Sequence, residues 1–169
     1  MNDGLGEKGR EEVRTFVKNG GGYVGICGGA YLACCGFRWS LDILNAKTVS
    51  SKWQRGKAEV KIAVNDAGQK VSGLPAAEHD ILYHNGPIIK PAGNKDLPDY
   101  ETLALFRTEI AEHGTPVGVM VNSPAWVRTT FGKGRVVISS PHPEQQDGME
   151  HFVENAVQWV TTKEAAAVP

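Results

Sequence analysis

The hydrophobic pattern predicts a helix near each end of the chain. The first is expected over residues 5–18 and the last over residues 149–160, where apolar positions recur at helical spacing. Asp147 and Glu150 predict a capping-box-like start for the last helix, and residues 161–169 are expected to form a frayed tail. The side chains expected to face the core are Leu5, Val13, Phe16 and Val17 in the first helix and Met149, Phe152, Val153, Ala156, Val157 and Val160 in the last.

Between these helices the pattern predicts short strands separated by turns. Tyr23–Ile26 is apolar on both faces, which is typical of a buried parallel strand. Asn65–Gly68 is expected to be a turn, and Gly132–Gly134 a tight hairpin between the last two strands. The other strands are expected at Lys47–Ser51, Ala58–Val64, Asp80–Tyr83, Thr102–Thr108, Pro116–Val121, Ala125–Phe131 and Arg135–Ser140.

A cysteine lies where the first strand turns into a helix. Gly25-Ile26-Cys27-Gly28-Gly29 has the form G-x-C-x-G, the thiol version of a nucleophile elbow. Gly25 and Gly29 are expected to remove β-carbons that would clash at this turn. The start of the next helix favours a thiolate at Cys27, and the N–H of Gly28 is placed to donate to an oxyanion. Glycine-rich turns of this kind also bind phosphate, so this stretch alone leaves a catalytic and an inert cysteine open.

A histidine and a carboxylate follow a later strand. His142 comes directly after Val136–Ser140, at the strand's carboxyl end, where open α/β sheets place their sites. Glu144 lies two residues on, and Pro143 stiffens the segment between them. In an extended segment the two side chains point to one side, so the carboxylate can hold the imidazole in one tautomer. We therefore expect Cys27 as nucleophile, His142 as base and Glu144 as the residue that orients His142.

The two motifs together resemble a known family. G-I-C-G-G-A-Y-L-A around Cys27 and G-K-G-R-V-V-I-S-S-P-H-P-E ending at Glu144 are similar to the class I glutamine amidotransferase-like superfamily. More narrowly they resemble the biotin-protein ligase N-terminal-domain family, and the likeness includes Asn85-Gly86-Pro87. The resemblance implies an α/β, flavodoxin-like three-layer sandwich with a mostly parallel central sheet and a Cys27–His142–Glu144 triad.

The chain departs from that family in two places. Amidotransferases of this class usually read G-x-C-x-G-x-Q, where the glutamine side chain helps to hold the substrate. Tyr31 occupies that position here, which argues against glutamine as the substrate. The chain also begins just past the strands and glycine-rich loop with which the family usually starts. The sheet is therefore expected to lack N-terminal strands, and its exposed edge would favour association with a second copy as a homodimer.

Four other residues are candidates for substrate contact. His84 and Asn85 follow a strand and are expected either to line the pocket or to form an ordinary turn. Tyr31 faces the elbow, where substrate contact and plain packing are equally open, and Gly29 lies beside it. The remaining histidines lack ligand spacing, so we expect no metal site and no cofactor. Trp39, Trp53, Trp126 and Trp159 are expected in the core or at its rim, and Lys52, Arg55 and Lys57 as a solvated run.

Composition narrows the class of protein. The 169 residues are expected to form a single domain, residues 162–169 being a tail. A net charge of -1 gives no case for nucleic acid or an anionic membrane, and no apolar run approaches the length of a membrane span. Three cysteines are not a disulfide framework; Cys34 and Cys35 are expected to be buried in the helix after the elbow. A reducing, cytoplasmic location fits best.

These observations favour a glutamine amidotransferase-like domain that acts on a small amide or acyl substrate. Cys27 would attack the acyl carbon and form a thioester, which water or an amine then resolves. Two alternatives stay open. One is a non-catalytic ligand-binding or regulatory module of the same fold, and the other is a peptidase-like or deglycase-like relative.

Overall fold

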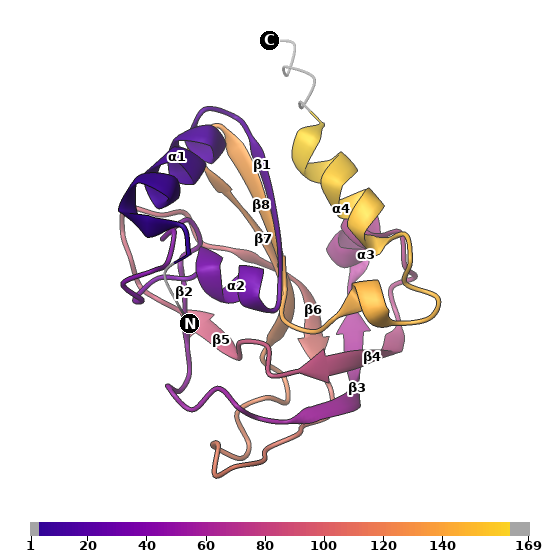
Figure 1. The fold of residues 1–169 in the computed structure, drawn as a ribbon. Coiled ribbons are helices and arrows are strands. Elements are labelled where there is room, and N and C mark those ends of the chain that lie inside the picture. The colour runs from indigo at the N-terminus through magenta and orange to yellow at the C-terminus, as the bar shows by residue number, and fades with distance from the viewer. Residues whose placement is uncertain (1–3, 163–169) are drawn as a thin grey trace.

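Helices cover both faces of a curled six-stranded sheet (Figure 1). The computed structural model describes residues 4–162, so most of the expected tail lies outside the described residues. The helices are α1 (Gly6–Lys18), α2 (Gly28–Ala33), α3 (Asp66–Ser72), α4 (Phe152–Thr161) and the short 3-10 helix η1 (Pro143–Gln145). The strands are β1 (Gly22–Ile26), β2 (Ala46–Thr48), β3 (Lys57–Val64), β4 (Glu78–His84), β5 (Ile89–Pro91), β6 (Glu101–Phe106), β7 (Pro124–Phe131) and β8 (Gly134–Ser139).

The sheet has the order β1-β8-β7-β6-β3-β4 and is mixed. Within residues 4–162 only β1 and β8 pair in parallel, and every other neighbouring pair of this sheet is antiparallel. The α/β class is confirmed, but the expectation of a mostly parallel sheet is wrong and a flavodoxin-like arrangement is not confirmed. The reason is local, because Gly132-Lys133 joins β7 to β8 as a hairpin, and tight turns produce antiparallel pairs.

Side chains that alternate along the strands build a core on each face. In β8, Val137 packs toward the α3 and α4 side, where it joins a cluster with Phe152. Its neighbours Val136 and Ile138 face the α1 and α2 side and join a cluster with Val17. The sheet therefore lies between two helical layers, as Figure 1 shows for α1 and α2 on one side and α4 on the other.

The two terminal helices lie as expected, but some of their apolar residues do not. Phe16 is 60% exposed, and Leu5 and Val157 are also exposed, so the expectation that these three face the core is wrong. Phe16 instead lies across the chain at Gly21, where its ring leaves no room for a β-carbon. The capping box is also wrong, since α4 begins at Phe152 and no side chain caps it.

Several local expectations in the middle of the chain are corrected. Asn65–Gly68 is not an isolated turn, because the Asn65 side chain accepts from the N–H of Gly68 at 2.8 Å and caps α3. The helix after the elbow ends at Ala33, so Cys34 and Cys35 lie beyond it, although Cys34 is buried. The pattern predicts a strand near β2 but none at β5, which has only three residues and pairs with β2. The expected strand Pro116–Val121 is an irregular loop.

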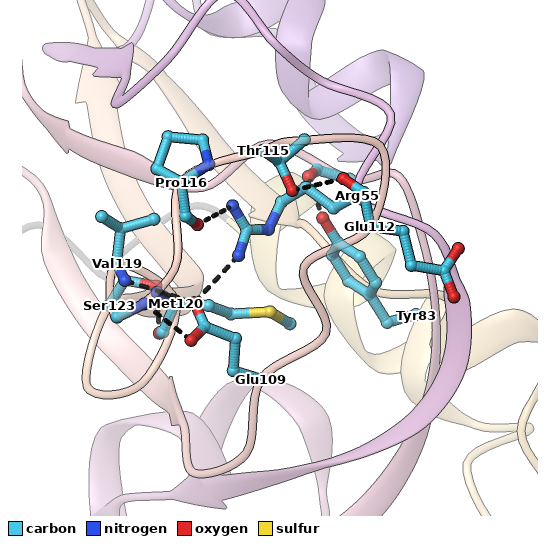
Figure 2. Close-up of polar contacts among 11 residues, drawn as sticks. Arg55, Tyr83, Glu109, Glu112, Thr115, Pro116, Val119, Met120 and Ser123 are labelled. Carbon is cyan, nitrogen blue, oxygen red and sulfur yellow. Dashed lines mark hydrogen bonds and ion pairs between the residues drawn. The ribbon is translucent and has the colours of Figure 1, made fainter.

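A buried ion pair holds this loop in place. Figure 2 shows the guanidinium of Arg55 reaching into the loop, where Nη2 lies 2.9 Å from Glu109 Oε1 and Nη1 donates to the carbonyl oxygen of Pro116 at 2.9 Å. Glu109 in turn accepts from the N–H groups of Gly118 and Met120. The Arg55 side chain is only 3% exposed, so the expectation that it belongs to a solvated run is wrong. Backbone N–H groups that a strand would use for a ladder bind a carboxylate instead.

No helix in residues 4–162 combines the length and apolar character needed to cross a bilayer. β1 lies at one edge of the sheet. Its association with a second copy stays a prediction.

Candidate active site

The one parallel strand pair brings the ends of β1 and β8 to the same edge of the sheet. Ile26 is in register with Ser139, and the N–H of Cys27 continues the ladder by donating to the Ser139 carbonyl oxygen at 2.9 Å. Cys27 therefore lies one residue beyond β1, and His142 three residues beyond β8. The N–H of His142 donates to the carbonyl oxygen of Leu82 in β4 at 2.8 Å, which ties the histidine segment to a third strand.

Cys27 occupies a strained position at the turn. Its backbone has φ 49° and ψ −98°, a conformation that non-glycine residues rarely adopt. A β-carbon at Gly25 would lie 2.7 Å from the carbonyl oxygen of Gly29, so the elbow requires glycine there. A β-carbon at Gly29 would meet only the Tyr23 hydroxyl at 3.6 Å, so the expected steric need at Gly29 is wrong. The turn that carries Cys27 therefore requires glycine at Gly25, but not at Gly29.

His142 and Glu144 form a close pair. His142 Nδ1 lies 2.6 Å from Glu144 Oε1, and the amide of Gln145 also donates to that oxygen at 3.1 Å. The segment is not extended as expected, because Pro143–Gln145 forms η1 and curls Glu144 back toward the ring. A carboxylate can only accept, so Nδ1 donates to Glu144, and Nε2 is the ring nitrogen left outside this pair. Nε2 is buried and has no hydrogen-bond partner in the described part of the chain.

The surroundings of Cys27 favour the protonated form of its side chain. It donates to the carbonyl oxygen of His84 at 3.4 Å, and the unpartnered Nε2 of His142 is not bonded to it. Burial raises the pKa of the Cys27 thiol; the N–H of Gly28 opposes this rise, and the charge of Glu144 adds to it. This direction of the pKa shift does not favour the resting thiolate that the helix start predicts. The six-residue helix α2 does not outweigh the loss of water around the sulfur.

Cys27 and His142 line one pocket of about 540 Å³. Three of the four expected contact positions, Tyr31, His84 and Asn85, line it, whereas Gly29 is not among the lining residues. His84 and His142 both line this pocket, and their ring centroids are 6.3 Å apart. The lining residues are Cys27, Gly28, Tyr31, Phe37, Trp39, Ser50, Ser51, Trp53, His84, Asn85 and His142.

Tyr31 stands where the family has glutamine, and its hydroxyl is already engaged. The hydroxyl donates to the carbonyl oxygen of Asn85 at 3.1 Å, and burial raises the pKa of the phenol. Asn85 has φ 58°, and its side-chain oxygen accepts from the N–H of Gly56 at 2.8 Å. Any β-carbon at Gly86 would collide with the carbonyl oxygen of Ser140. The Asn85-Gly86 turn thus packs tightly against the end of β8 and supports the pocket wall.

Sequence reasoning missed the aromatic part of the pocket. Trp39 and Trp53 were expected in the core or at its rim, yet both line the pocket together with Phe37. Trp126 is buried as expected, and Trp159 lies beneath the guanidinium groups of Arg128 and Arg135. A signal for Trp53 was present, because an aromatic residue between Lys52 and Gln54 has no apolar neighbours to pack with along the chain.

No group of three His, Cys, Asp or Glu side chains in residues 4–162 is arranged to hold a metal ion.

Comparison with known proteins finds similar folds. The family model "Biotin-protein ligase, N terminal" matches residues 2–52, which contain α1, β1, Cys27 and α2. A ThuA-like protein from Bacteroides uniformis superposes with a TM-score of 0.57 at 20% identity, covering 93% of this chain and 65% of its own. The cytoplasmic protein STM3548 from Salmonella typhimurium gives 0.55 at 12% identity, covering 92% and 61%.

The fold is class I glutamine amidotransferase-like. The resemblance seen in the sequence is thereby confirmed. A β-galactosidase from Bacillus circulans contains a similar fold, with a TM-score of 0.55 at 17% identity over 93% of this chain and 21% of the enzyme. The chain thus spans less than two thirds of each of these three structures. No curated protein sequence matches it significantly. At these identities the likeness concerns the amidotransferase-like fold alone.

Proposed function

We propose that this amidotransferase-like domain transfers or hydrolyses acyl groups through a thioester on Cys27. One observation carries the proposal. The pocket that contains the Cys27 thiol also contains His142, whose Nδ1 is held by Glu144 and whose Nε2 is buried without a partner. A buried nitrogen lone pair without a partner costs free energy, and such a cost is typical of groups poised for proton transfer.

The chemistry follows the roles of a nucleophile, a base and an orienting group. His142 Nε2 takes the thiol proton as the sulfur of Cys27 attacks the acyl carbon, and the imidazolium is stabilised by Glu144. The N–H of Gly28 donates to the oxyanion of the tetrahedral intermediate. His142 then gives the proton to the leaving group, and a thioester remains. Water or an amine attacks it, and the thiol is regenerated with its proton.

The direction of the Cys27 pKa shift favours one of two forms of this mechanism. A preformed thiolate–imidazolium pair requires a thiol with a depressed pKa. Burial instead raises the pKa of Cys27, which supports deprotonation during the attack itself. The thiol has to turn from the His84 carbonyl oxygen toward His142 first. Hydrogen bonds of this kind often tighten only when substrate is bound.

A mapped labelling experiment tests the proposal, with the other two cysteines as internal controls. Cys34 is buried, and its pKa is raised to about 12, so it should stay unlabelled. Cys35 is partly exposed, and burial raises the pKa of its thiol as it does for Cys27, so it is a comparison thiol with the same direction of shift. With p-nitrophenyl acetate as the acyl probe, we expect the acetyl group on Cys27 first. Acetylation of Cys27 no faster than that of Cys35 would contradict the proposal.

One observation favours a second candidate, a ligand-binding module without catalysis. The Cys27 thiol donates to a carbonyl oxygen rather than to His142, which suits a static role. In that case Cys27→Ser, which keeps a donor of similar shape, would retain every function of the protein. For the acyl-transfer proposal, the same variant abolishes turnover.

We also propose a reducing location such as the cytoplasm. Cys27, Cys34 and Cys35 are all free thiols, and the proposed reaction needs Cys27 reduced.

A further inference from the structure

Aromatic rings form much of the pocket beside Cys27. Phe37 and Trp39 stack with ring centroids 4.6 Å apart and planes inclined by 10°, and Tyr31 meets Phe37 edge-on at 6.3 Å. Trp53 lines the same pocket and is 52% exposed. A half-exposed indole keeps apolar surface in contact with water. A flat apolar ligand that covers this surface gains the free energy of burying it.

Formal charges are missing from the same walls. None of the described residues that line the pocket is Asp, Glu, Lys or Arg. Lys52 and Arg55 lie close to Trp53 along the chain and are occupied, since Lys52 Nζ donates to the carbonyl oxygen of Gly114 and Arg55 is paired with Glu109. Arg38, between Phe37 and Trp39, is exposed. An amino acid would have to bury its ammonium and carboxylate groups there without partners, which is costly. This disfavours charged acyl donors such as glutamine.

The polar side chains of the pocket are largely engaged with the protein itself. Asn85 Oδ1 accepts from Gly56, Ser50 Oγ accepts from the N–H of Lys52, and the Tyr31 hydroxyl donates to Asn85. Ser51 and the ring of His84 also line the pocket and stay open to a ligand. Most of the exposed lining surface is nonetheless apolar, so apolar contact is the main interaction that the walls offer. The volume of about 540 Å³ lies within the range of roughly 300–1,000 Å³ found for small-molecule pockets.

We propose that the acyl group transferred to Cys27 is uncharged, flat and apolar, of the aryl or arylalkyl class, with its ring against Trp53 and Trp39. This inference rests on the proposed function and names its substrate class. In the step itself, the bond from the acyl carbon to its leaving group breaks and the carbon–sulfur bond forms. The leaving group departs with the proton that His142 took from the thiol. Water then releases an arylalkyl carboxylic acid and restores Cys27.

The test compares acyl groups on one leaving group. The p-nitrophenyl esters of 3-phenylpropanoic acid and acetic acid acylate the protein, and free cysteine under the same conditions gives their intrinsic reactivity ratio. On Cys27 the phenylpropanoyl-to-acetyl ratio should exceed the free-cysteine ratio by about tenfold, the scale of one good aromatic contact. Trp53→Ala should reduce this preference toward the free-cysteine ratio, and Trp53→Phe, which keeps a ring, should retain most of it.

Trp159→Phe is the control, because Trp159 belongs to α4 and packs against Arg128 and Arg135 rather than in the pocket. It should leave the preference unchanged. A ratio equal to that of free cysteine, with Cys27 still acylated faster than Cys35, would overturn the substrate class and leave the proposed function intact. No selective acylation of Cys27 by either ester would overturn both. Faster acylation by γ-glutamyl-p-nitroanilide than by the phenylpropanoyl ester, after correction for intrinsic reactivity, would also overturn the inference.

Discussion

Glu144 holds one nitrogen of His142 at 2.6 Å and leaves the other nitrogen buried with no partner. The pair is assembled within three consecutive residues, because η1 turns the carboxylate back onto the ring. The thiol of Cys27 reaches the same pocket from the end of a different strand. The imidazole is thus already oriented by Glu144, whereas the Cys27 thiol is bonded to the His84 carbonyl oxygen instead of to His142.

Replacing Glu144 should separate two kinds of cysteine reactivity. Glu144→Gln removes the group that orients and stabilises the imidazolium, so acyl transfer should fall by about 10²-fold. The charge of Glu144 also raises the pKa of Cys27, so its loss should leave alkylation by iodoacetamide at neutral pH as fast or faster. Steady-state acyl transfer and mapped alkylation rates measure the two effects.

Glu154→Gln is the control for that substitution, because Glu154 also lies near a histidine, His151, but on the exposed face of α4. It should change neither rate. Equal loss of both reactivities in Glu144→Gln would show that the carboxylate only supports the local structure.

The pH dependence of Cys27 alkylation should follow from its raised pKa. A thiol whose pKa lies above its ordinary value of 9.0 keeps its proton at neutral pH. The alkylation rate of the free protein should therefore keep rising through pH 9 and level off only above it. Mapped iodoacetamide labelling over a pH series measures the rate at Cys27, with circular dichroism as a check of folding. A plateau below that value would indicate a thiolate–imidazolium pair instead.

The elbow glycines should differ in their tolerance of a methyl group. Gly25→Ala places a β-carbon 2.7 Å from the backbone of Gly29, which should lower the free energy of unfolding by about 1–3 kcal/mol, as overpacking usually does. Gly29→Ala meets no backbone and lies within α2, so it should be neutral or stabilising. Urea denaturation measures both. Similar destabilisation by the two variants would contradict the geometry of the turn.

The sequence placed Cys27 and His142 at strand ends that meet at one pocket, because both positions depend on local patterns. A glycine before a cysteine at a strand end, and a histidine after a buried strand, are features of a few adjacent residues. The sheet direction, the buried Arg55 and the wall around Trp53 depend on contacts between distant segments. Arg55, for example, meets Glu109 54 positions later in the chain. No short pattern in the sequence marks such a pair, so the sequence predicts that Arg55 is solvated like Lys52 and Lys57.

The Arg55–Glu109 pair should stabilise the loop beside the pocket. Burial would raise the pKa of Glu109, but the N–H groups of Gly118 and Met120, together with Arg55, outweigh it and hold the pKa below 4.5. Glu109→Gln should lower the free energy of unfolding at neutral pH by about 2 kcal/mol, the scale of lost charge-assisted hydrogen bonds. Because the folded-state pKa is depressed, this contribution is present above 4.5 and is lost as pH falls through the folded value.

Denaturation of the wild type and Glu109→Gln at a series of pH values measures this difference. The gap between them should narrow in acid. Glu112→Gln is the control, since Glu112 is exposed in the same loop. A gap that stays constant down to strongly acid pH would contradict the assignment to Glu109.

The most direct measurement is the rate at which Cys27 is acylated with and without the imidazole. His142→Asn and the wild type would be mixed with p-nitrophenyl acetate at neutral pH, and acetyl-Cys27 would be followed by mass spectrometry of quenched samples. We predict that the variant forms acetyl-Cys27 at least about 10²-fold more slowly, while labelling of Cys35 is unchanged. Acetylation of Cys27 at the same rate in both proteins would contradict the assignment of His142 as the base.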